Sequence, residues 1–271
     1  CKGVFFLKIG FIGCGNMAQA MMGGMIRNKL CAPGDITVHD ISPTAEERAR
    51  TDFGVSAVET NAEVLQNCQL VVLAVKPRFY EEVLREIAPE VQEDKVILSI
   101  APGKSLAWIE EIFGGQKLPI IRTMPNTPAM VGEGITAVCP NEQVCPEMLD
   151  MALEVLGCCG KTEVVPEYLL DAVVAVSGSA PAYVFLFIEA MADAAVAEGM
   201  PRNQAYSFAA QAVLGSAKMV LDTGKHPGEL KDMVCSPGGT TIEAVQVLEE
   251  TGFRSSVMQA MRACAEKSRS I

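Results

Sequence analysis

The fold is decided by Ile9-Gly10-Phe11-Ile12-Gly13-Cys14-Gly15-Asn16-Met17-Ala18, where an apolar strand pattern passes through a glycine-rich turn into a helical pattern. The turn has the form G-x-G-x-x-A, a fingerprint of dinucleotide binding when a strand precedes it and a helix follows it. Gly13 permits the tight turn, Gly15 lets the backbone approach a pyrophosphate, and Ala18 keeps the helix close to the strand. The competing interpretation is an ordinary glycine-rich connection. The flanking patterns favour a Rossmann-type domain.

Further strand patterns extend over the first 165 residues, and the run 70–75 is continuously apolar, as in the middle of a parallel sheet. The expected strands are 7–12, 36–40, 70–75, 96–100, 119–124, 135–139 and 161–165, and helices are expected at 16–28 and 146–156. Open α/β sheets bind cofactors at the carboxyl ends of their strands, where Lys76 and Pro77 lie in this pattern. Residues 1–165 are therefore expected to form a dinucleotide-binding α/β domain with a mainly parallel sheet.

Asp40 ends the second expected strand, 25 residues after Gly15, where the usual spacing is about 20. A carboxylate at this place accepts hydrogen bonds from the ribose hydroxyls of NAD and repels the additional phosphate of NADP. Without the glycine motif, Asp40 would be only an acidic residue at the end of a strand. Ser42 and Pro43 follow it as the cap and the first turn of the next helix.

Strand patterns stop at Pro166, and long helical patterns occupy the rest of the chain. Helices are expected at 182–199, 203–223, 227–234, 240–251 and 254–269. The first two contain few charged residues, so we expect them to be buried. Because so short a segment has little room to bury them alone, we infer a homodimer that forms through these helices. Residues 166–271 are expected to form an all-helical domain for dimerisation and substrate binding.

A second glycine-rich turn, Ser236-Pro237-Gly238-Gly239-Thr240-Thr241, opens an amphipathic helical pattern. A helix N-terminus binds anions because its first N–H groups are unpaired and the helix dipole is positive there. The N–H groups of Gly239, Thr240 and Thr241 are therefore candidates for binding an anion. When the turn is considered alone, an ordinary Ser/Thr helix cap explains these residues better. The nucleotide signature at the other end of the chain favours the binding interpretation.

The composition excludes several classes of protein. The chain has 271 residues, of which 49% are hydrophobic, and this length favours two domains. Its net charge of −11 argues against nucleic acid or an anionic membrane as the main partner. No uninterrupted apolar stretch reaches the roughly 18 residues of a membrane-spanning helix. The apolar run at 1–7 is broken by Lys8 and has no cleavage pattern, which favours a strand over a leader peptide.

The cysteines favour packing over metal binding. The chain has ten cysteines but no C-x-x-C pair, and it has only two histidines, so no metal site is expected. Scattered thiols among apolar or small residues are typical of a reducing compartment, where cysteine acts as a small hydrophobic residue. We therefore expect a cytoplasmic protein.

Six motifs are spread over almost the whole chain. They are IGFIGCGNMAQA (9–20), LAVKP (73–77), RTMPNTP (122–128), AVSGSAPAY (175–183), HPGELKDMVCSPGGTTIEAV (226–245) and GFRS (252–255). Together they resemble the pyrroline-5-carboxylate reductase family, and the fifth is the most specific of them. The resemblance implies a Rossmann domain and a helical domain that interlocks with its partner's, in dimers that commonly assemble into a decamer. It also implies reduction of the cyclic imine 1-pyrroline-5-carboxylate to L-proline with NADPH or NADH.

The same resemblance implies roles for individual residues. The cofactor would be bound by Gly13, Gly15, Asn16, Met17, Asn61, Val75, Lys76 and Ala101. Their positions at the strand ends add Asp40, Ser42 and Pro77 to the expected cofactor site. The substrate would be bound by Glu167, Ser236, Gly239, Thr240 and Thr241. The Thr241 hydroxyl would be the catalytic group, as a hydrogen-bond partner or proton relay for the imine nitrogen. The alternative role for Thr241 is only to cap its helix.

The sequence departs from the family at the end of the second strand. Members that favour NADP often carry Asn-Arg before the Ser-Pro pair, whereas this chain has Asp40 and Ile41. We therefore expect NADH to be used, alone or together with NADPH.

Two other functions remain open at this point. A β-hydroxyacid dehydrogenase also pairs a Rossmann domain with a helical one, but it needs a catalytic lysine in a G-x-x-x-N-x-x-K pattern that we do not find. A non-catalytic nucleotide-binding regulator would keep the fold, but the site motifs argue against it. A six-membered cyclic imine also remains open as a substrate, because ring size depends on the shape of the site.

Overall fold

The computed structural model describes residues 7–270. Cys1 and residues 2–6, where the sequence favours a strand over a leader peptide, lie outside that range. The chain divides into two compact units. The first contains the residues up to Gly178 together with Ala265 and the residues after it, and the second is Ser179–Cys264.

An eight-stranded sheet forms the centre of the first unit, with the strand order β3-β2-β1-β4-β5-β6-β7-β8. The strands are β1 (Ile9–Ile12), β2 (Ile36–His39), β3 (Ser56–Ala57), β4 (Leu70–Leu73), β5 (Val96–Ser99), β6 (Ile120–Met124), β7 (Gly134–Pro140) and β8 (Gly160–Val164). All neighbouring strands are parallel except β6 and β7. The part from β3 to β6 has the order of the dinucleotide-binding Rossmann fold, so the expected fold class is confirmed.

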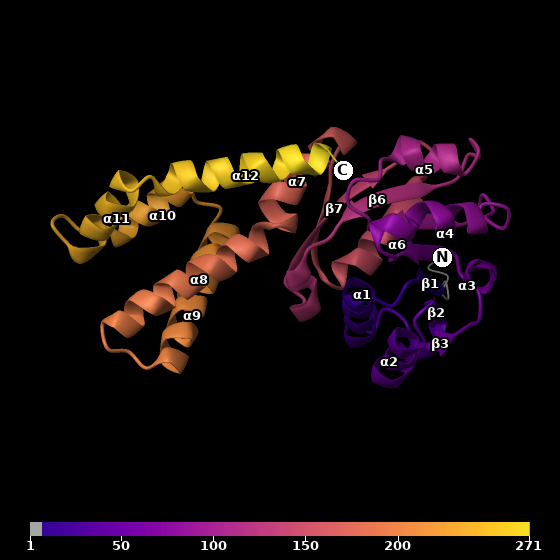
Figure 1. Cartoon of the computed structure of the whole chain (residues 1–271), viewed down its shortest axis with the longest axis horizontal. Coiled ribbons are helices and arrows are strands. Elements are labelled where there is room, and N and C mark those ends of the chain that lie inside the picture. The colour runs from indigo at the N-terminus through magenta and orange to yellow at the C-terminus, as the bar shows by residue number, and fades with distance from the viewer. Residues whose placement is uncertain (1–6, 271) are drawn as a thin grey trace. The chain divides into compact units, whose positions relative to one another are not determined.

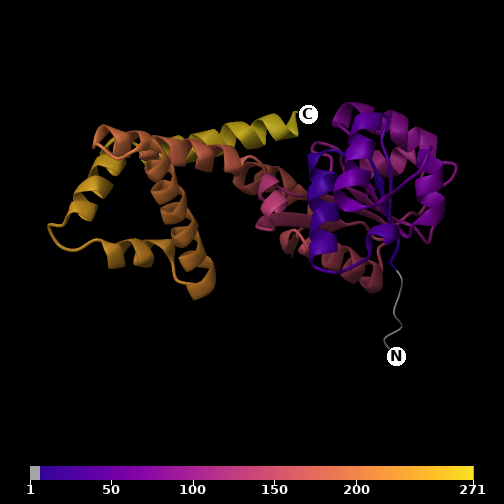
Figure 2. The ribbon, with the colours of Figure 1, turned by 90° about the horizontal axis from the view of Figure 1, so that it is seen from below.

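Helices cover both faces of this sheet (Figures 1 and 2). One face packs against α1 (Asn16–Arg27), α2 (Pro43–Phe53) and α6 (Pro146–Gly157). The other packs against α3 (Asn61–Asn67), α4 (Tyr80–Ile87) and α5 (Leu106–Ile112). Because both faces are covered, the central strands are mostly apolar, and all four residues of β4 are buried.

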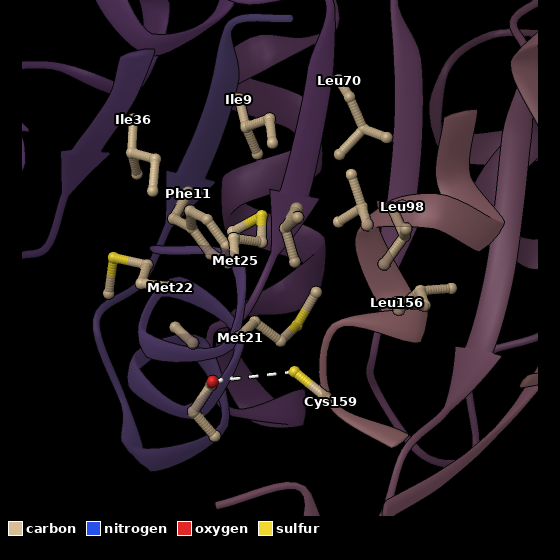
Figure 3. Close-up of a cluster of buried hydrophobic side chains, with 14 of the residues drawn as sticks. Ile9, Phe11, Met21, Met22, Met25, Ile36, Leu70, Leu98, Leu156 and Cys159 are labelled. Carbon is tan, nitrogen blue, oxygen red and sulfur yellow. Dashed lines mark hydrogen bonds between the residues drawn. The ribbon is translucent and has the colours of Figure 1, made fainter. Parts of the chain in front are cut away.

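The face under α1 is filled largely by methionine side chains. Figure 3 shows Met21, Met22 and Met25 of α1 packed beside Ile9 and Phe11 of β1. These unbranched side chains fit the irregular space between a helix and a twisted sheet. The expectation that cysteines serve packing is met here too, because the buried Cys159 thiol lies 3.6 Å from the Ala20 carbonyl oxygen.

The second unit is helical. Its helices are α8 (Ala180–Ala197), α9 (Arg202–Thr223), α10 (Pro227–Val234), α11 (Thr240–Glu250) and most of α12 (Phe253–Arg269). The first two lie side by side (Figure 1). In the chain, α8 is preceded by the short helix α7 (Leu170–Val173) and a π-helical turn, Val174–Gly178.

The apolar side chains of these helices are exposed in the single chain. Phe185 and Leu186 of α8 are 63% and 67% exposed, and Phe208 of α9 is 66% exposed. By length and composition alone, the helical stretch Glu167–Ala197 is apolar enough to cross a membrane, and only 11% of its most apolar window is buried. Large apolar surfaces of this kind mark sites that another surface covers. The sequence attributes that cover to a second copy of the chain.

Candidate functional site

A cavity of about 410 Å³ lies at the carboxyl ends of β1, β2 and β4. It is lined by seven of the eleven residues expected to bind the cofactor, namely Gly13, Gly15, Asp40, Ser42, Asn61, Val75 and Lys76. The other four lie near the same strand ends. Asn16 and Met17 begin α1, Pro77 begins a short 3₁₀ helix (Pro77–Phe79), and the buried Ala101 follows β5. The residues expected to bind the cofactor therefore lie together at the carboxyl ends of the strands.

The glycine turn between β1 and α1 has two different glycines. Gly13 has a φ of +101°, and a Cβ there would lie 2.8 Å from the carbonyl carbon and oxygen of Ala74. A Cβ on Gly15 would meet no atom within 4 Å. Gly13 is therefore required by the fold itself, whereas Gly15 keeps one side of the turn open. Since no side chain caps α1 at Gly15, its first N–H groups fit a pyrophosphate on that open side.

Asp40 holds the turn from the end of β2. Its Oδ2 accepts the N–H of Cys14 at 2.6 Å, and its Oδ1 accepts the N–H of Ser42 at 2.8 Å. Burial, and to a smaller extent the negative charges of Asp40 and Glu46, together raise the pKa of the Cys14 thiol to about 12. The thiol therefore stays protonated and inert at neutral pH. An ionised carboxylate has about four acceptor positions, so Asp40 can accept further hydrogen bonds.

Asn61 supplies a second acceptor. Its side chain is 5% exposed, and its Nδ2 donates to Glu86 Oε2 at 2.9 Å. Its Oδ1 is buried and has no hydrogen-bond partner. Buried polar atoms are almost always paired, so an orphaned acceptor in a cavity wall fits a bound ligand that donates to it. The open glycine, the helix N-terminus and the two acceptors, on Asp40 and Asn61, together fit a nicotinamide dinucleotide.

Glu86 and Glu82 also line this cavity, and the sequence did not indicate them. Both lie on α4, where the apolar residues Leu84 and Ile87 are buried against the sheet. In an amphipathic helix such glutamates are expected on the solvent face. Only the position of α4 beside α3 identifies them as neighbours of the site.

Glu167, which the family resemblance places near the substrate, lies elsewhere in the first unit. Its carboxylate accepts from Arg122 at 2.7 Å and from the N–H of Leu106 at 2.8 Å. The Arg122 side chain is 12% exposed, so this ion pair is partly buried. Glu167 lines a second hollow, of about 830 Å³, rather than the cofactor cavity. The sequence did not indicate Arg122 as its partner.

The expected anion-binding turn lies in the second unit. Gly238 has a φ of +63°, and the N–H of Gly239 donates to the Ser236 carbonyl at 3.0 Å. Gly239 is the N-cap of α11 and provides no side-chain cap, so Thr240 and Thr241 are its first two helical residues. The alternative that Thr241 is only the helix cap does not fit this arrangement. The N–H groups of the first turn fit a carboxylate.

His226 lies directly before α10 and caps this helix. Its Nδ1 accepts the N–H of Gly228 at 3.0 Å. In the second unit, the N-terminus of α11 with the hydroxyl groups of Thr240 and Thr241 is the place where the sequence analysis expects the substrate.

Comparison with known proteins identifies the family. Residues 167–271 match the family model for pyrroline-5-carboxylate reductase dimerisation, and residues 8–103 match that for coenzyme F420-dependent NADP oxidoreductases. The chain is 54% identical over 261 residues to the pyrroline-5-carboxylate reductase of Escherichia coli K12, covering 96% of this chain and 97% of that one. The chain belongs to the pyrroline-5-carboxylate reductase family.

Solved structures agree with this assignment. The pyrroline-5-carboxylate reductase of Coxiella burnetii superimposes with a TM-score of 0.91 at 34% identity, covering 98% of both chains. The pyrroline carboxylate reductase of Plasmodium falciparum, solved with NADP bound, has a TM-score of 0.88 at 32% identity and 99% coverage of both chains. A nicotinamide cofactor and a helical dimerisation region are thus properties of the pyrroline-5-carboxylate reductase family that this chain shares. The matches do not favour a β-hydroxyacid dehydrogenase or a non-catalytic regulator.

The two glycines of the turn should respond differently to the same substitution. Gly13→Ala should lower the free energy of unfolding by about 1–3 kcal/mol from backbone strain alone, and the contact with Ala74 adds to this. Gly15→Ala should fold normally, because its φ is −67°, but should raise the Kd for NADH by about tenfold or more, or 1.4 kcal/mol. Urea unfolding and NADH fluorescence titration measure the two effects. Equal loss of stability in both variants would contradict this division of roles.

Proposed function

We infer that this chain reduces 1-pyrroline-5-carboxylate to L-proline with a reduced nicotinamide dinucleotide, the last step of proline biosynthesis. The observation that carries this inference is the end-to-end match at 54% identity to a reductase of that name. The cavity at the glycine turn supports it, because its open glycine, helix N-terminus and acceptors suit a dinucleotide.

The reaction requires little acid–base catalysis from the protein. When bound, the nicotinamide supplies a hydride to the imine carbon. A cyclic imine that binds already protonated is the more electrophilic iminium, so the protein mainly provides proximity and orientation. In our proposal the N–H groups of Thr240 and Thr241 hold the substrate carboxylate beside Ser236 and Gly239, because the Gly239 N–H is already paired with the Ser236 carbonyl. The Thr241 hydroxyl contacts the imine nitrogen, and Glu167 is the further residue that we propose for substrate binding.

We also propose that NADH is used at least as well as NADPH. The carboxylate of Asp40 closes the glycine turn, and Glu46 lies close enough to Asp40 to accept its N–H at 3.5 Å. The Asp40 carboxylate can accept from ribose hydroxyls and, with Glu46 close by, repels a ribose phosphate. The remaining cofactor contacts follow the family motifs at Asn16, Met17, Pro77 and Ala101.

The two halves of the chain divide this work. We propose that residues 1–165 bind the cofactor and that residues 166–271 form the dimer and hold the substrate. The dimerisation model matches residues 167–271, and the exposed apolar side chains of α8 and α9 lie in that range. Assembly of dimers into a decamer and a cytoplasmic location complete the proposal. Free thiols at the nine cysteines of residues 7–270 support a reducing compartment.

An enzyme assay tests the activity directly. NADH or NADPH should be oxidised in the presence of 1-pyrroline-5-carboxylate, with L-proline as the product. A 3-hydroxy acid with oxidised cofactor is the control for the dehydrogenase alternative, and the six-membered imine homologue tests ring size. Turnover of the hydroxy acid but not of the pyrroline would overturn the proposal.

The Asp40 carboxylate should set the cofactor ratio. Asp40→Asn removes the charge and keeps an acceptor for only one of the two backbone N–H groups that Asp40 binds, so kcat/KM for NADPH relative to NADH should rise about tenfold, a difference of 1.4 kcal/mol. Asp35→Asn is the matched control, because Asp35 also accepts a backbone N–H, that of Ala32, but lies outside the cavity. A wild-type enzyme that strongly prefers NADPH would show that the electrostatic interpretation is wrong.

The Thr241 hydroxyl should matter for turnover rather than for folding. Thr241→Ala should keep the fold and lose roughly 10²–10³ in kcat, the scale for one positioned donor. Thr251→Ala is the matched control, because its hydroxyl donates to the Val247 carbonyl at the opposite end of α11. Steady-state kinetics with a thermal melt for each variant make the comparison. An unchanged kcat in Thr241→Ala would remove this residue from the chemistry.

A further inference from the structure

The amide of Asn61 is anomalous among the residues that the structure describes. Within residues 7–270, its Oδ1 is the one buried side-chain nitrogen or oxygen atom that has no hydrogen-bond partner. The same amide uses its Nδ2 to donate to Glu86 Oε2 at 2.9 Å. Both residues line the cavity that the glycine turn and Asp40 also line. One end of the amide is therefore engaged by the protein, and the other end is unpaired.

The carboxylate of Glu86 determines which end is left. An ionised carboxylate only accepts hydrogen bonds, so it pairs with the Nδ2 of Asn61 and not with the Oδ1. Turning the amide by 180° would place two acceptors against each other and lose the hydrogen bond. The orientation of Asn61 is thus fixed chemically by its partner on α4, and the vacant atom is an acceptor.

We propose that Glu86 is a positioning residue that makes Asn61 a hydrogen-bond acceptor for a ribose hydroxyl of the cofactor, and thereby disfavours a phosphorylated ribose. This inference rests on the proposed function, since it assumes that the cavity takes a nicotinamide dinucleotide. A ribose offers two neighbouring hydroxyl donors, and the cavity offers two acceptors, Asn61 and Asp40. A phosphate has only acceptors at neutral pH and would meet an amide oxygen and carboxylates.

In this proposal Glu86 acts through the hydrogen bond that orients Asn61, and not only through its negative charge. Glutamine has nearly the same shape as glutamate but offers both an N–H donor and an oxygen acceptor. With glutamine at this position, the amide of Asn61 is free to turn and present its Nδ2 to a phosphate. Glu86→Gln should therefore change which cofactor binds, through the orientation of another side chain.

The test compares binding of the two cofactors without substrate. Fluorescence titration of the full-length protein gives Kd for NADH and for NADPH. In Glu86→Gln the ratio of Kd values should shift toward NADPH by roughly three- to tenfold, the range for one net hydrogen bond. Glu82→Gln is the matched control, because Glu82 lies four residues earlier on the same helix and lines the same cavity. It removes an equal charge without touching the Asn61 bond.

A second comparison shows whether Glu86 acts through Asn61. In an Asn61→Ala background, Glu86→Gln should shift the ratio no further, because the amide that it orients is gone. An equal shift in Glu82→Gln and Glu86→Gln would overturn the proposal in favour of charge alone. A full shift in the Asn61→Ala background, or no shift in Glu86→Gln, would overturn it as well. The wild-type assay with 1-pyrroline-5-carboxylate judges the proposed function separately, because the ratio is measured without turnover.

Discussion

The hydrogen bond from the Cys14 N–H to the Asp40 carboxylate fixes the part of the molecule on which the cofactor site depends. It joins the turn after β1 to the end of β2, and the Gly13 N–H reinforces it by donating to the His39 carbonyl at 2.8 Å. Between these contacts and the Ala74 backbone there is no space for a side chain at Gly13. The turn is therefore rigid on its inner side, and its outer side stays open at Gly15. The fold fixes the backbone conformation at Gly13, and this holds the open side of the turn at Gly15 in place as a binding surface.

The architecture was predictable from the sequence because its signals are local. A buried strand such as β4 is a continuous apolar run, and the G-x-G-x-x-A turn carries its conformational requirement in its own residues. The two-residue strand β3 was missed because so short an element has no periodicity. The partners Glu86 of Asn61 and Arg122 of Glu167 were missed for a different reason. These pairs are 25 and 45 residues apart, and only the packing of separate elements brings them together.

The helical half shows how one sequence signal can be correct while its first interpretation is incomplete. The low charge of α8 and α9 predicts burial, yet in the single chain Phe185 and Phe208 are largely exposed. The family model for dimerisation covers these helices, and in our proposal a second copy of the chain covers their exposed apolar side chains. The same segment contains the N-terminus of α11. In our proposal, assembly and substrate binding therefore depend on the same group of helices.

The distribution of polar groups follows from the kind of reaction that the family performs. Hydride transfer to an iminium needs no strong base at the reacting atoms, and the groups with acid–base capacity are accordingly used for structure. The ring of His226 caps α10, and the Cys14 thiol is held protonated by burial and by neighbouring carboxylates. What the proposed site supplies instead are backbone N–H groups, amides and hydroxyls at fixed positions. The orientation of such groups depends on the hydrogen bonds that hold them. In our proposal Glu86 therefore influences the choice of cofactor through its hydrogen bond to Asn61, without contacting the cofactor itself.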